Sequence, residues 1–322
     1  MRPRLINHTA GRHAAITPTA TGWAAIHQNP GTVRVYDPHL DTITTIPAPD
    51  RRTQITADTQ HIAISSTHGL TVTTHDGTTR WHRTWTETGE THPNTWSTPH
   101  CHLADGTLWT HLQNAAQIIT YDPATGRELD RHALPDAGNG WFVEHPHQDA
   151  LALNIVVCPI DHQQAWQLRL DNGRISAHRL PDAGYLAGFL PGNRYFSTGP
   201  DGLAVQHADG HDQIRRDVDD LPDSEPGRHL SEAAVVIPDS HILIAVSTEE
   251  DHGYEQHLLL SADLRYHSTV EYPQPRKRNS LRAASGHGRW LTYDDTRGVL
   301  ELWELDGHLD EHGIPGQLSL FP

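Results

Sequence analysis

The sequence predicts an all-β fold, a seven-bladed β-propeller built from four-stranded antiparallel blades. Runs rich in Val, Ile, Thr, Tyr and Trp recur along the 322 residues, with Gly, Asp, Asn or Pro between them roughly every ten residues and no long helical period. The first and last of seven recurrent Asp turns lie 269 residues apart, so the mean period is about 45 residues, the length of one four-stranded blade. These turns begin at Asp37, Asp76, Asp122, Asp171, Asp209, Asp263 and Asp306.

The chemistry of these turns explains why they recur. An Asp carboxylate accepts hydrogen bonds from backbone N–H groups two residues further along the chain. Pro follows the first and third of the seven Asp residues and presets φ, whereas Gly or Asn follows four others and adopts the left-handed conformation that closes a hairpin. Each Asp therefore marks the same point in successive blades.

The third repeat shows the four strands of a blade most clearly. We expect them at residues 100–104, 107–112, 117–121 and 128–134, because each run is β-rich and the gaps hold turn residues. Similar quartets start near Arg12, Thr53, Gly140, Leu186, Ser231 and Ser280.

The seventh repeat has three clear strands, at residues 281–285, 290–293 and 299–305, and a weak fourth. Residues 4–9 at the N-terminus supply a strand that completes this blade. Such a strand closes the ring and removes the open sheet edges of a propeller.

The resemblance to known families rests on this period and on the last blade. Residues 299–305 (Val-Leu-Glu-Leu-Trp-Glu-Leu) are the best local match to the WD-repeat and quinoprotein-like propellers of actinobacteria, which the chain resembles over nearly its whole length, although no Trp-Asp dipeptide occurs. The resemblance implies the propeller fold. It implies no particular role, because many unrelated functions share this fold.

Charge and composition favour some classes of partner over others. The formal net charge is −16, from 24 Lys and Arg against 40 Asp and Glu, and such a charge repels a nucleic-acid backbone. No run approaches 18 apolar residues, and the first residues lack an apolar signal segment. With only Cys101 and Cys158 present, we expect a cytoplasmic protein without broad nucleic-acid or membrane binding.

We expect residues 1–312 to form one propeller domain and residues 313–322 to form a tail. Gly313, Pro315 and Gly316 read as a linker. The last residues resemble the peptide with which bacterial replication and repair proteins bind the DNA polymerase sliding clamp, and all five positions match: Gln317, Leu318, Ser319, Leu320 and Phe321.

In that resemblance, Leu318, Leu320 and Phe321 enter an apolar cleft, and Gln317 hydrogen-bonds at its edge. The alternative is that these residues form a final strand, because Leu318 and Leu320 alternate as strand residues do. The sequence leaves both possibilities open.

Several clusters raise the question of a metal. His100, Cys101 and His102 lie on one predicted strand, and the next strand brings His111 near, a set that zinc would accept. His145, His147 and Asp149 pose the same question in the following repeat. Because 27 histidines occur throughout the chain, we expect these side chains to pack in inner strands, and we assign neither a metal nor a cofactor.

Charged runs are expected to be solvated. Residues 217–225 and 249–255 are rich in Asp and Glu, but neither follows a spaced calcium-binding loop. Residues 276–278 (Arg-Lys-Arg) form the sharpest basic run and are expected in an exposed connecting loop that is also able to meet a phosphate.

The tryptophans are expected mainly between blades. The alternative is that some line a face or a central pocket, and we expect Trp96 at the surface. The members of this group are Trp81, Trp85, Trp96, Trp109 and Trp141.

No GxSxG, HExxH, Walker or GxGxxG motif occurs, so we assign no catalytic residue. We expect a non-catalytic interaction scaffold, a monomeric propeller within a larger complex, whose tail recruits it to the sliding clamp. The alternative is an enzyme or ligand-binding propeller with an axial pocket that contains His100, His102, His145 and His147. A third possibility is a purely structural subunit, whose complex survives removal of the tail.

Overall fold

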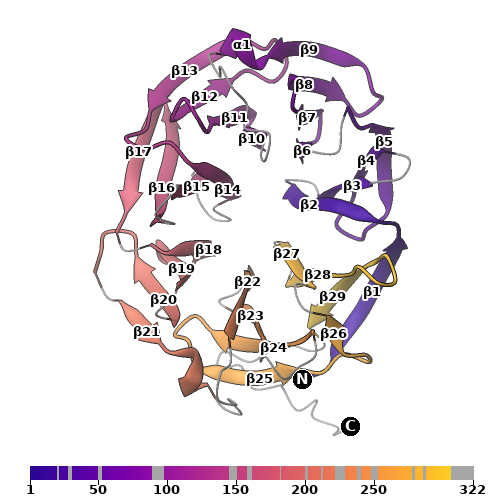
Figure 1. Cartoon of the computed structure of the whole chain (residues 1–322), viewed down its shortest axis with the longest axis vertical. Coiled ribbons are helices and arrows are strands. Elements are labelled where there is room, and N and C mark those ends of the chain that lie inside the picture. The colour runs from indigo at the N-terminus through magenta and orange to yellow at the C-terminus, as the bar shows by residue number, and fades with distance from the viewer. Residues whose placement is uncertain are drawn as a thin grey trace, which may run out of the picture. The chain divides into compact units, whose positions relative to one another are not determined.

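The computed structural model confirms the predicted fold. Seven antiparallel sheets form the blades of a seven-bladed β-propeller (Figure 1). The structure describes residues 1–19, 22–27, 31–49, 53–88, 98–144, 151–157, 162–181, 183–199, 202–211, 213–221, 229–237, 241–247, 253–277, 280–285 and 288–305.

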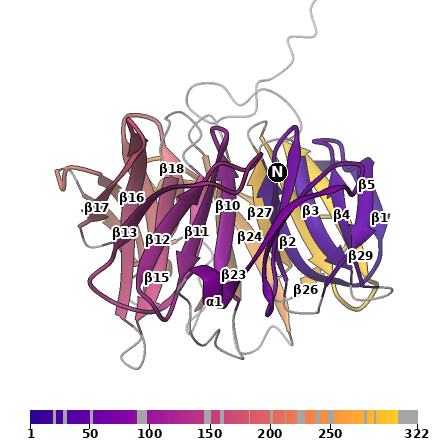
Figure 2. The same cartoon turned by 90° about the horizontal axis from the view of Figure 1, so that it is seen from above.

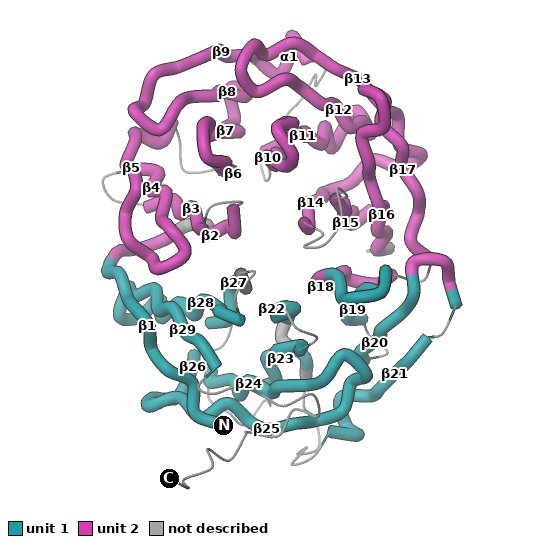
Figure 3. Tube along the Cα trace, turned by 180° about the vertical axis from the view of Figure 1, so that it is seen from behind, with its two compact units in different colours: residues 1–10, 189–207, 211–322 teal, residues 11–188, 208–210 magenta. Residues whose placement is uncertain are grey.

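The chain divides into two compact units (Figure 3). Unit 2 comprises residues 11–188 and 208–210 and contains the first four blades. Unit 1 comprises residues 1–10, 189–207 and 211–322, and contains most of the fifth blade together with the sixth and seventh. None of the helices in the described ranges is long and apolar enough to cross a membrane.

In unit 2, strands that are consecutive in sequence are neighbours in each sheet. Figure 2 shows the four strands of the third blade following one another across the sheet. The first two blades contain β2 (His13–Thr19), β3 (Gly22–His27), β4 (Thr32–Tyr36) and β5 (Thr42–Pro47), then β6 (Gln54–Ala57), β7 (His61–Ser65), β8 (Gly69–Thr74) and β9 (Thr79–Thr84), followed by the short helix α1 (Trp85–Thr88). The next two contain β10 (His100–Ala104), β11 (Thr107–Leu112), β12 (Gln117–Tyr121) and β13 (Glu128–Ala133), then β14 (Asn139–Glu144), β15 (Leu151–Val157), β16 (His162–Asp171) and β17 (Arg174–Leu180).

The fifth blade begins at the end of unit 2 and continues in unit 1, and the sixth and seventh blades belong to unit 1. The fifth contains β18 (Tyr185–Leu190), β19 (Arg194–Gly199), β20 (Gly202–His207) and β21 (Ile214–Arg216), followed by the 3₁₀ turn η1 (Val218–Asp220). The sixth contains β22 (His229–Ile237), β23 (His241–Ser247), β24 (Tyr254–Ser261) and β25 (Tyr266–Val270), with β26 (Arg276–Lys277) also paired to β24. The seventh contains β27 (Leu281–Ser285), β28 (Arg289–Asp294), β29 (Val299–Leu305) and β1 (Pro3–Ala10).

The seventh blade is completed by the N-terminal strand, as predicted. β1 pairs antiparallel with β29 from Pro3 opposite Leu305 to Ala10 opposite Val299, with a bulge after Leu5. All four strands of this blade therefore lie before residue 306.

Six of the seven predicted Asp turns lie between the third and fourth strands of blades one to six, and Asp306 lies outside the described residues. In the first blade, Asp37 Oδ1 accepts hydrogen bonds from the N–H groups of His39 and Asp41. In the sixth blade, Leu264 takes the left-handed conformation, with φ of 59°. The turn position is thus kept even where Gly and Asn are absent.

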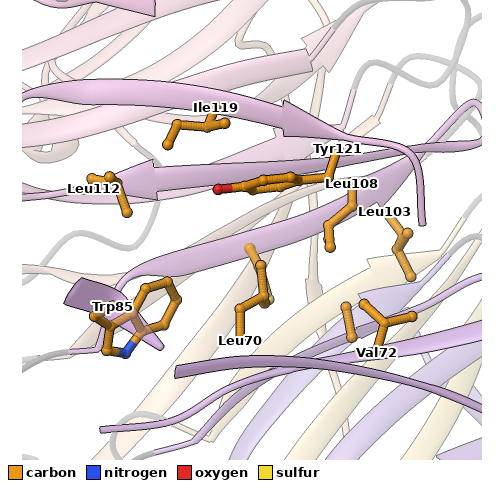
Figure 4. Packing of buried hydrophobic residues seen from close by; sticks show 10 residues of the cluster. Leu70, Val72, Trp85, Leu103, Leu108, Leu112, Ile119 and Tyr121 are labelled. Carbon is orange, nitrogen blue, oxygen red and sulfur yellow. The ribbon is translucent and has the colours of Figure 1, made fainter. Parts of the chain in front are cut away.

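Apolar side chains pack between adjacent blades. Figure 4 shows one such cluster between the second and third blades, where Leu70 and Val72 of β8 and Trp85 of α1 pack with Leu103 of β10 and Tyr121 of β12. Each fully buried side chain of this kind contributes roughly 1.5–3 kcal/mol. Packing between blades is thus a main source of stability.

Polar contacts also join the second and third blades. Trp81 Nε1 donates to the carbonyl of Pro123 over 2.7 Å, and Arg83 donates to the carbonyl of Gly126 over 3.0 Å. Gly126 has a φ of +71°, and a Cβ placed on it would lie 2.8 Å from the Trp81 ring. Only glycine combines that backbone conformation with so close an approach.

The tryptophan prediction is confirmed for Trp81, Trp85 and Trp109, which pack in clusters between blades. Trp96 lies outside the described residues.

Candidate functional site

The histidines singled out in the third blade lie on one face of two paired strands. His100 of β10 is directly opposite His111 of β11, and His102 is opposite Trp109. Because alternate strand residues share a face, His100, His102, His111 and Trp109 lie together. The prediction that the second strand brings His111 near is confirmed.

This histidine face is buried against the fourth blade. His102 is 5% exposed and His111 is 0% exposed. A Cβ placed on Gly140 of β14 would lie 2.8 Å from His111 Nδ1, and the His102 ring is 6.2 Å from the Phe142 ring. The predicted inner packing of His102 and His111 is therefore confirmed, and Gly140 makes room for the imidazole.

Burial keeps these imidazoles neutral. It lowers the pKa of His100 and of His102 to about 4, and burial followed by the nearby His100 lowers the pKa of His111 to about 3. Within the described residues, neither ring nitrogen of His111 has a hydrogen-bond partner. The face is thus uncharged at neutral pH, and His111 is sealed from solvent.

A second cross-strand histidine pair occupies the corresponding position of the first blade. His13 of β2 is opposite His27 of β3, with ring centroids 4.2 Å apart. His27 Nε2 lies 2.8 Å from the Tyr36 hydroxyl, and a Cβ on Gly11 would lie 2.6 Å from His27 Nδ1. Burial, and next the charge of Arg34, lowers the pKa of His27 to about 4.

The geometry does not assemble these side chains into a metal centre. Among the described residues, no group of three or more His, Cys, Asp or Glu is placed to hold a metal ion. The Cys101 side chain lies on the other, apolar face of β10, and burial there raises the pKa of its thiol to about 12. His145, His147 and Asp149, the other candidates for a ligand or an axial pocket, lie outside the described residues.

Unit 1 contains a buried polar network that was not predicted. Glu255 Oε1 lies 2.9 Å from His257 Nε2 and accepts from both the N–H and the hydroxyl of Ser280, over 2.8 and 2.7 Å. The hydroxyl of Tyr272 lies 2.7 Å from His257 Nδ1 and accepts from Trp290 Nε1 over 2.7 Å. The expectation that the acidic run 249–255 is solvated is therefore wrong for Glu255, which is 5% exposed.

One tautomer of His257 satisfies the hydrogen bonds of this network. Burial raises the pKa of Tyr272 above its usual range, so its hydroxyl keeps its proton. While it accepts from Trp290, the Tyr272 hydroxyl can donate to His257 Nδ1, and the tautomer of His257 with its proton on Nε2 then donates to Glu255.

The network lacks the connectivity of a catalytic triad. In a Ser-His-acid triad, the serine and the acid bond to different imidazole nitrogens. Here Glu255 and Ser280 both lie at Nε2 of His257, and the hydroxyl donates to the carboxylate. The arrangement favours a structural role.

The basic run 276–278 also differs from expectation. Arg276 is 6% exposed, forms an ion pair with Glu301 and donates to the Thr292 hydroxyl. Its guanidinium lies 4.4 Å from the Tyr272 ring centroid and 4.9 Å from that of Trp303. The prediction of a solvated loop is wrong at Arg276, because the carboxylate of Glu301 on β29 compensates its charge and allows it to be buried. Arg278 lies outside the described residues.

The remaining acidic candidates behave as predicted where the structure describes them. Asp217, Asp219 and Asp220 are exposed, and Asp217 Oδ1 accepts from the N–H of Asp219. The other acidic residues of these runs, Asp223, Glu225, Glu249, Glu250 and Asp251, lie outside the described residues.

Trp141 is half-buried, as Trp81 is, and packs against the first strand of the next blade. Its ring centroid on β14 lies 4.7 Å from that of Tyr185 on β18, with an interplanar angle of 37°. In the same unit, the Asn154 side chain of β15 accepts a hydrogen bond from the Leu186 N–H over 3.0 Å and donates one to the Leu186 carbonyl over 2.8 Å. These two bonds fix β18 against β15 and so hold Trp141 and Tyr185 in register. The sequence singled out Trp141 but gave no signal for Tyr185.

The predicted partner-binding residues, Gln317, Leu318, Ser319, Leu320 and Phe321, lie outside the described residues.

Comparison with known proteins identifies the fold. No protein-family model and no curated protein matches the chain. The structure is similar to that of BamB from Moraxella catarrhalis, with 13% identity, coverage of 95% of this chain and 98% of that one, and a TM-score of 0.56. It is also similar to the Neurospora crassa Pan2 WD40 domain, with 8% identity, coverage of 95% and 96%, and a TM-score of 0.62. At these identities the similarity shows the propeller fold alone.

Proposed function

We propose that this propeller is a non-catalytic protein-binding platform of the cytoplasm, recruited to the DNA polymerase sliding clamp by its C-terminal tail. The observation that carries the proposal is the match of residues 317–321, Gln-Leu-Ser-Leu-Phe, to the clamp-binding peptide at all five positions. The low identity of the similar structures leaves the partner to be decided by experiment.

The completed seventh blade supports this proposal. The rival hypothesis makes the tail a final strand, but β1 already occupies the outer position beside β29. The blade therefore needs no strand from residues 306–322. A strand that contained Leu318 and Leu320 would be an addition to a complete four-stranded blade.

The chemistry of the tail sets the expected affinity. Burial of Leu318, Leu320 and Phe321 contributes roughly 5–8 kcal/mol before ordering costs. Ordering an extended segment offsets much of that gain, so we expect a dissociation constant of about micromolar or weaker. Such an affinity suits reversible recruitment.

The buried clusters support a non-catalytic role. His102 and His111 are sealed within the packing between blades, and Ser280 donates to Glu255 where a nucleophile would need a free base. Neither cluster presents an activated group to a substrate.

Calorimetry with a purified bacterial sliding clamp tests the proposal. The full chain is compared with a chain that lacks residues 317–322 and with the double variant Leu320→Ala, Phe321→Ala. We expect binding by the full chain and loss of binding in both variants. A Ser319→Asp variant is the matched control and should bind as well as the full chain, because the clamp-binding peptide carries either residue at that position. No binding by the full chain, or equal binding without the tail, contradicts clamp recruitment.

A further inference from the structure

The first strands of adjacent blades in unit 2 lie side by side on the inner side of that unit (Figure 3, magenta). We call the described residues of β10 and β14, with the turn after β10 and the start of β18, the inner wall. It contains no Lys or Arg, and its histidines are held neutral by burial. Its only charged side chains are the carboxylates of Asp105 and Glu144. The inner wall is therefore negative.

The two carboxylates follow the neighbouring inner strands, Asp105 directly after β10 and Glu144 at the end of β14. Asp105 is exposed at the tip of the turn between β10 and β11, and Glu144 is exposed at the end of β14. Although Glu144 reaches solvent, loss of hydration in its crowded surroundings, and next the Asp105 carboxylate, raises its pKa. No cation in the described residues offsets this repulsion at Glu144.

Trp141 is the inner wall's available aromatic surface. Trp81 and Trp85 donate their indole N–H groups to backbone carbonyls, whereas the indole N–H of Trp141 has no hydrogen-bond partner within the described part of the chain. Its contact there is with the ring of Tyr185. A half-buried tryptophan beside a tyrosine attracts cations through the negative faces of the rings.

Spacing connects the aromatic and acidic features. Trp141 and Glu144 are three residues apart on β14, about 10 Å along an extended strand, and point to opposite faces of it, Trp141 toward β18 and Glu144 toward β10. A peptide of four or five extended residues along the free edge of β14 spans that distance, and its own side chains three residues apart also point to opposite sides, so it can meet both features.

We propose that the inner wall binds a cationic peptide segment of a partner protein, with an arginine or lysine side chain against Trp141 and Tyr185 and a second cation near Glu144 and Asp105. This inference rests on the proposal that the propeller binds proteins and not on the tail. Arginine suits the aromatic pair best, because its planar guanidinium stacks on rings.

Fluorescence anisotropy with labelled hexa-arginine as the probe tests this site on the full chain in 50 mM and 200 mM salt. We expect Trp141→Ala to weaken binding about tenfold and Trp141→Phe to restore most of it. The double variant Asp105→Asn, Glu144→Gln should weaken binding several-fold and reduce its salt dependence. Tyr254→Ala, which removes an exposed aromatic of unit 1, should have no effect and is the matched control.

Three outcomes overturn the proposal: no binding of hexa-arginine in 50 mM salt, equal binding by the full chain and Trp141→Ala, or equal binding of neutral hexa-glutamine. Equal binding by Trp141→Ala would mean that the net charge alone attracts the probe. The thermal midpoint of each variant is measured as well, and the exposed Asp105 and Glu144 variants decide the question if Trp141→Ala fails to fold. Repeating the titration without residues 317–322 separates this site from the clamp proposal, because hexa-arginine binding should be unchanged.

Discussion

Acidification should destabilise this protein between pH 7.5 and pH 5 because its buried histidines resist protonation. His102 and His111 have pKa values of about 4 and 3 in the folded chain, against 6.5 for a solvated imidazole. The unfolded chain binds these protons as the pH falls through 6.5, and the folded chain does not until below pH 4. The contribution of these two neutral histidines to the unfolding free energy is thus fully present well above pH 6.5, and it is lost as the pH falls from 6.5 toward 4.

The magnitude follows from these pKa values. At pH 5 each of the two histidines favours the unfolded chain by about 2 kcal/mol relative to pH 7.5, or about 4 kcal/mol together. This is a large part of the 5–15 kcal/mol stability of a typical domain. Solvated Asp and Glu stay ionised over most of this window, so their contribution is small.

Urea denaturation at pH 7.5, 6 and 5, followed by tryptophan fluorescence, measures the effect. The double variant His102→Leu, His111→Leu should show a shallower dependence of unfolding free energy on pH. Replacement of the exposed His82 by Gln is the control and should keep the full dependence. An unfolding free energy that stays constant from pH 7.5 to 5 would refute the reasoning, as would an unchanged slope in the double variant.

Three further predictions concern single contacts. Gly126→Ala should lower the unfolding free energy by about 1–3 kcal/mol, because its Cβ would meet the Trp81 ring and its φ is left-handed. Chemical denaturation measures this change. Gly106 also has a left-handed φ but has open space around it, so Gly106→Ala should lower the unfolding free energy less. Arg276→Ala should lower the unfolding free energy by up to about 3–5 kcal/mol, because the buried Glu301 then keeps only the more exposed Arg297, 3.6 Å away, as a cationic partner. The double variant with Glu301→Gln should recover part of that loss in a thermal denaturation cycle. Removal of residues 1–9 should expose the edge of β29 and lower the melting temperature by several degrees, and an unchanged melting temperature would mean that β1 adds no stability.

Features that depend on local chemistry were predictable from the sequence. The Asp turns are encoded by side chains that bond to nearby backbone, as Asp37 does with His39 and Asp41. The strands of the third blade were predictable for the same reason, since turn residues bound each of them. The helix α1 also has a local signal that was missed: Thr84 precedes it, and the Glu87 carboxylate accepts from the Thr84 N–H over 2.7 Å, as in a capping box.

Features that depend on distant partners were not predictable. Arg276 is buried because Glu301, 25 residues away, neutralises it, and nothing near residue 276 reports that pairing. Glu255 accepts from Ser280 across the same sequence distance. The histidine face was half predictable, because strand alternation brings His100 and His111 together, while the approach of Gly140 depends on how the next blade packs.

The strand pair that completes the seventh blade constrains folding during synthesis. About 290 residues separate the end of β1 from its partner β29, so β1 leaves the ribosome well before β29 does. At roughly 5–20 residues per second, β1 waits about 15–60 s for its partner. During that time its backbone edge and exposed Leu5 lack their native neighbour, so the nascent chain should be most prone to aggregation and chaperone binding before its last blade emerges.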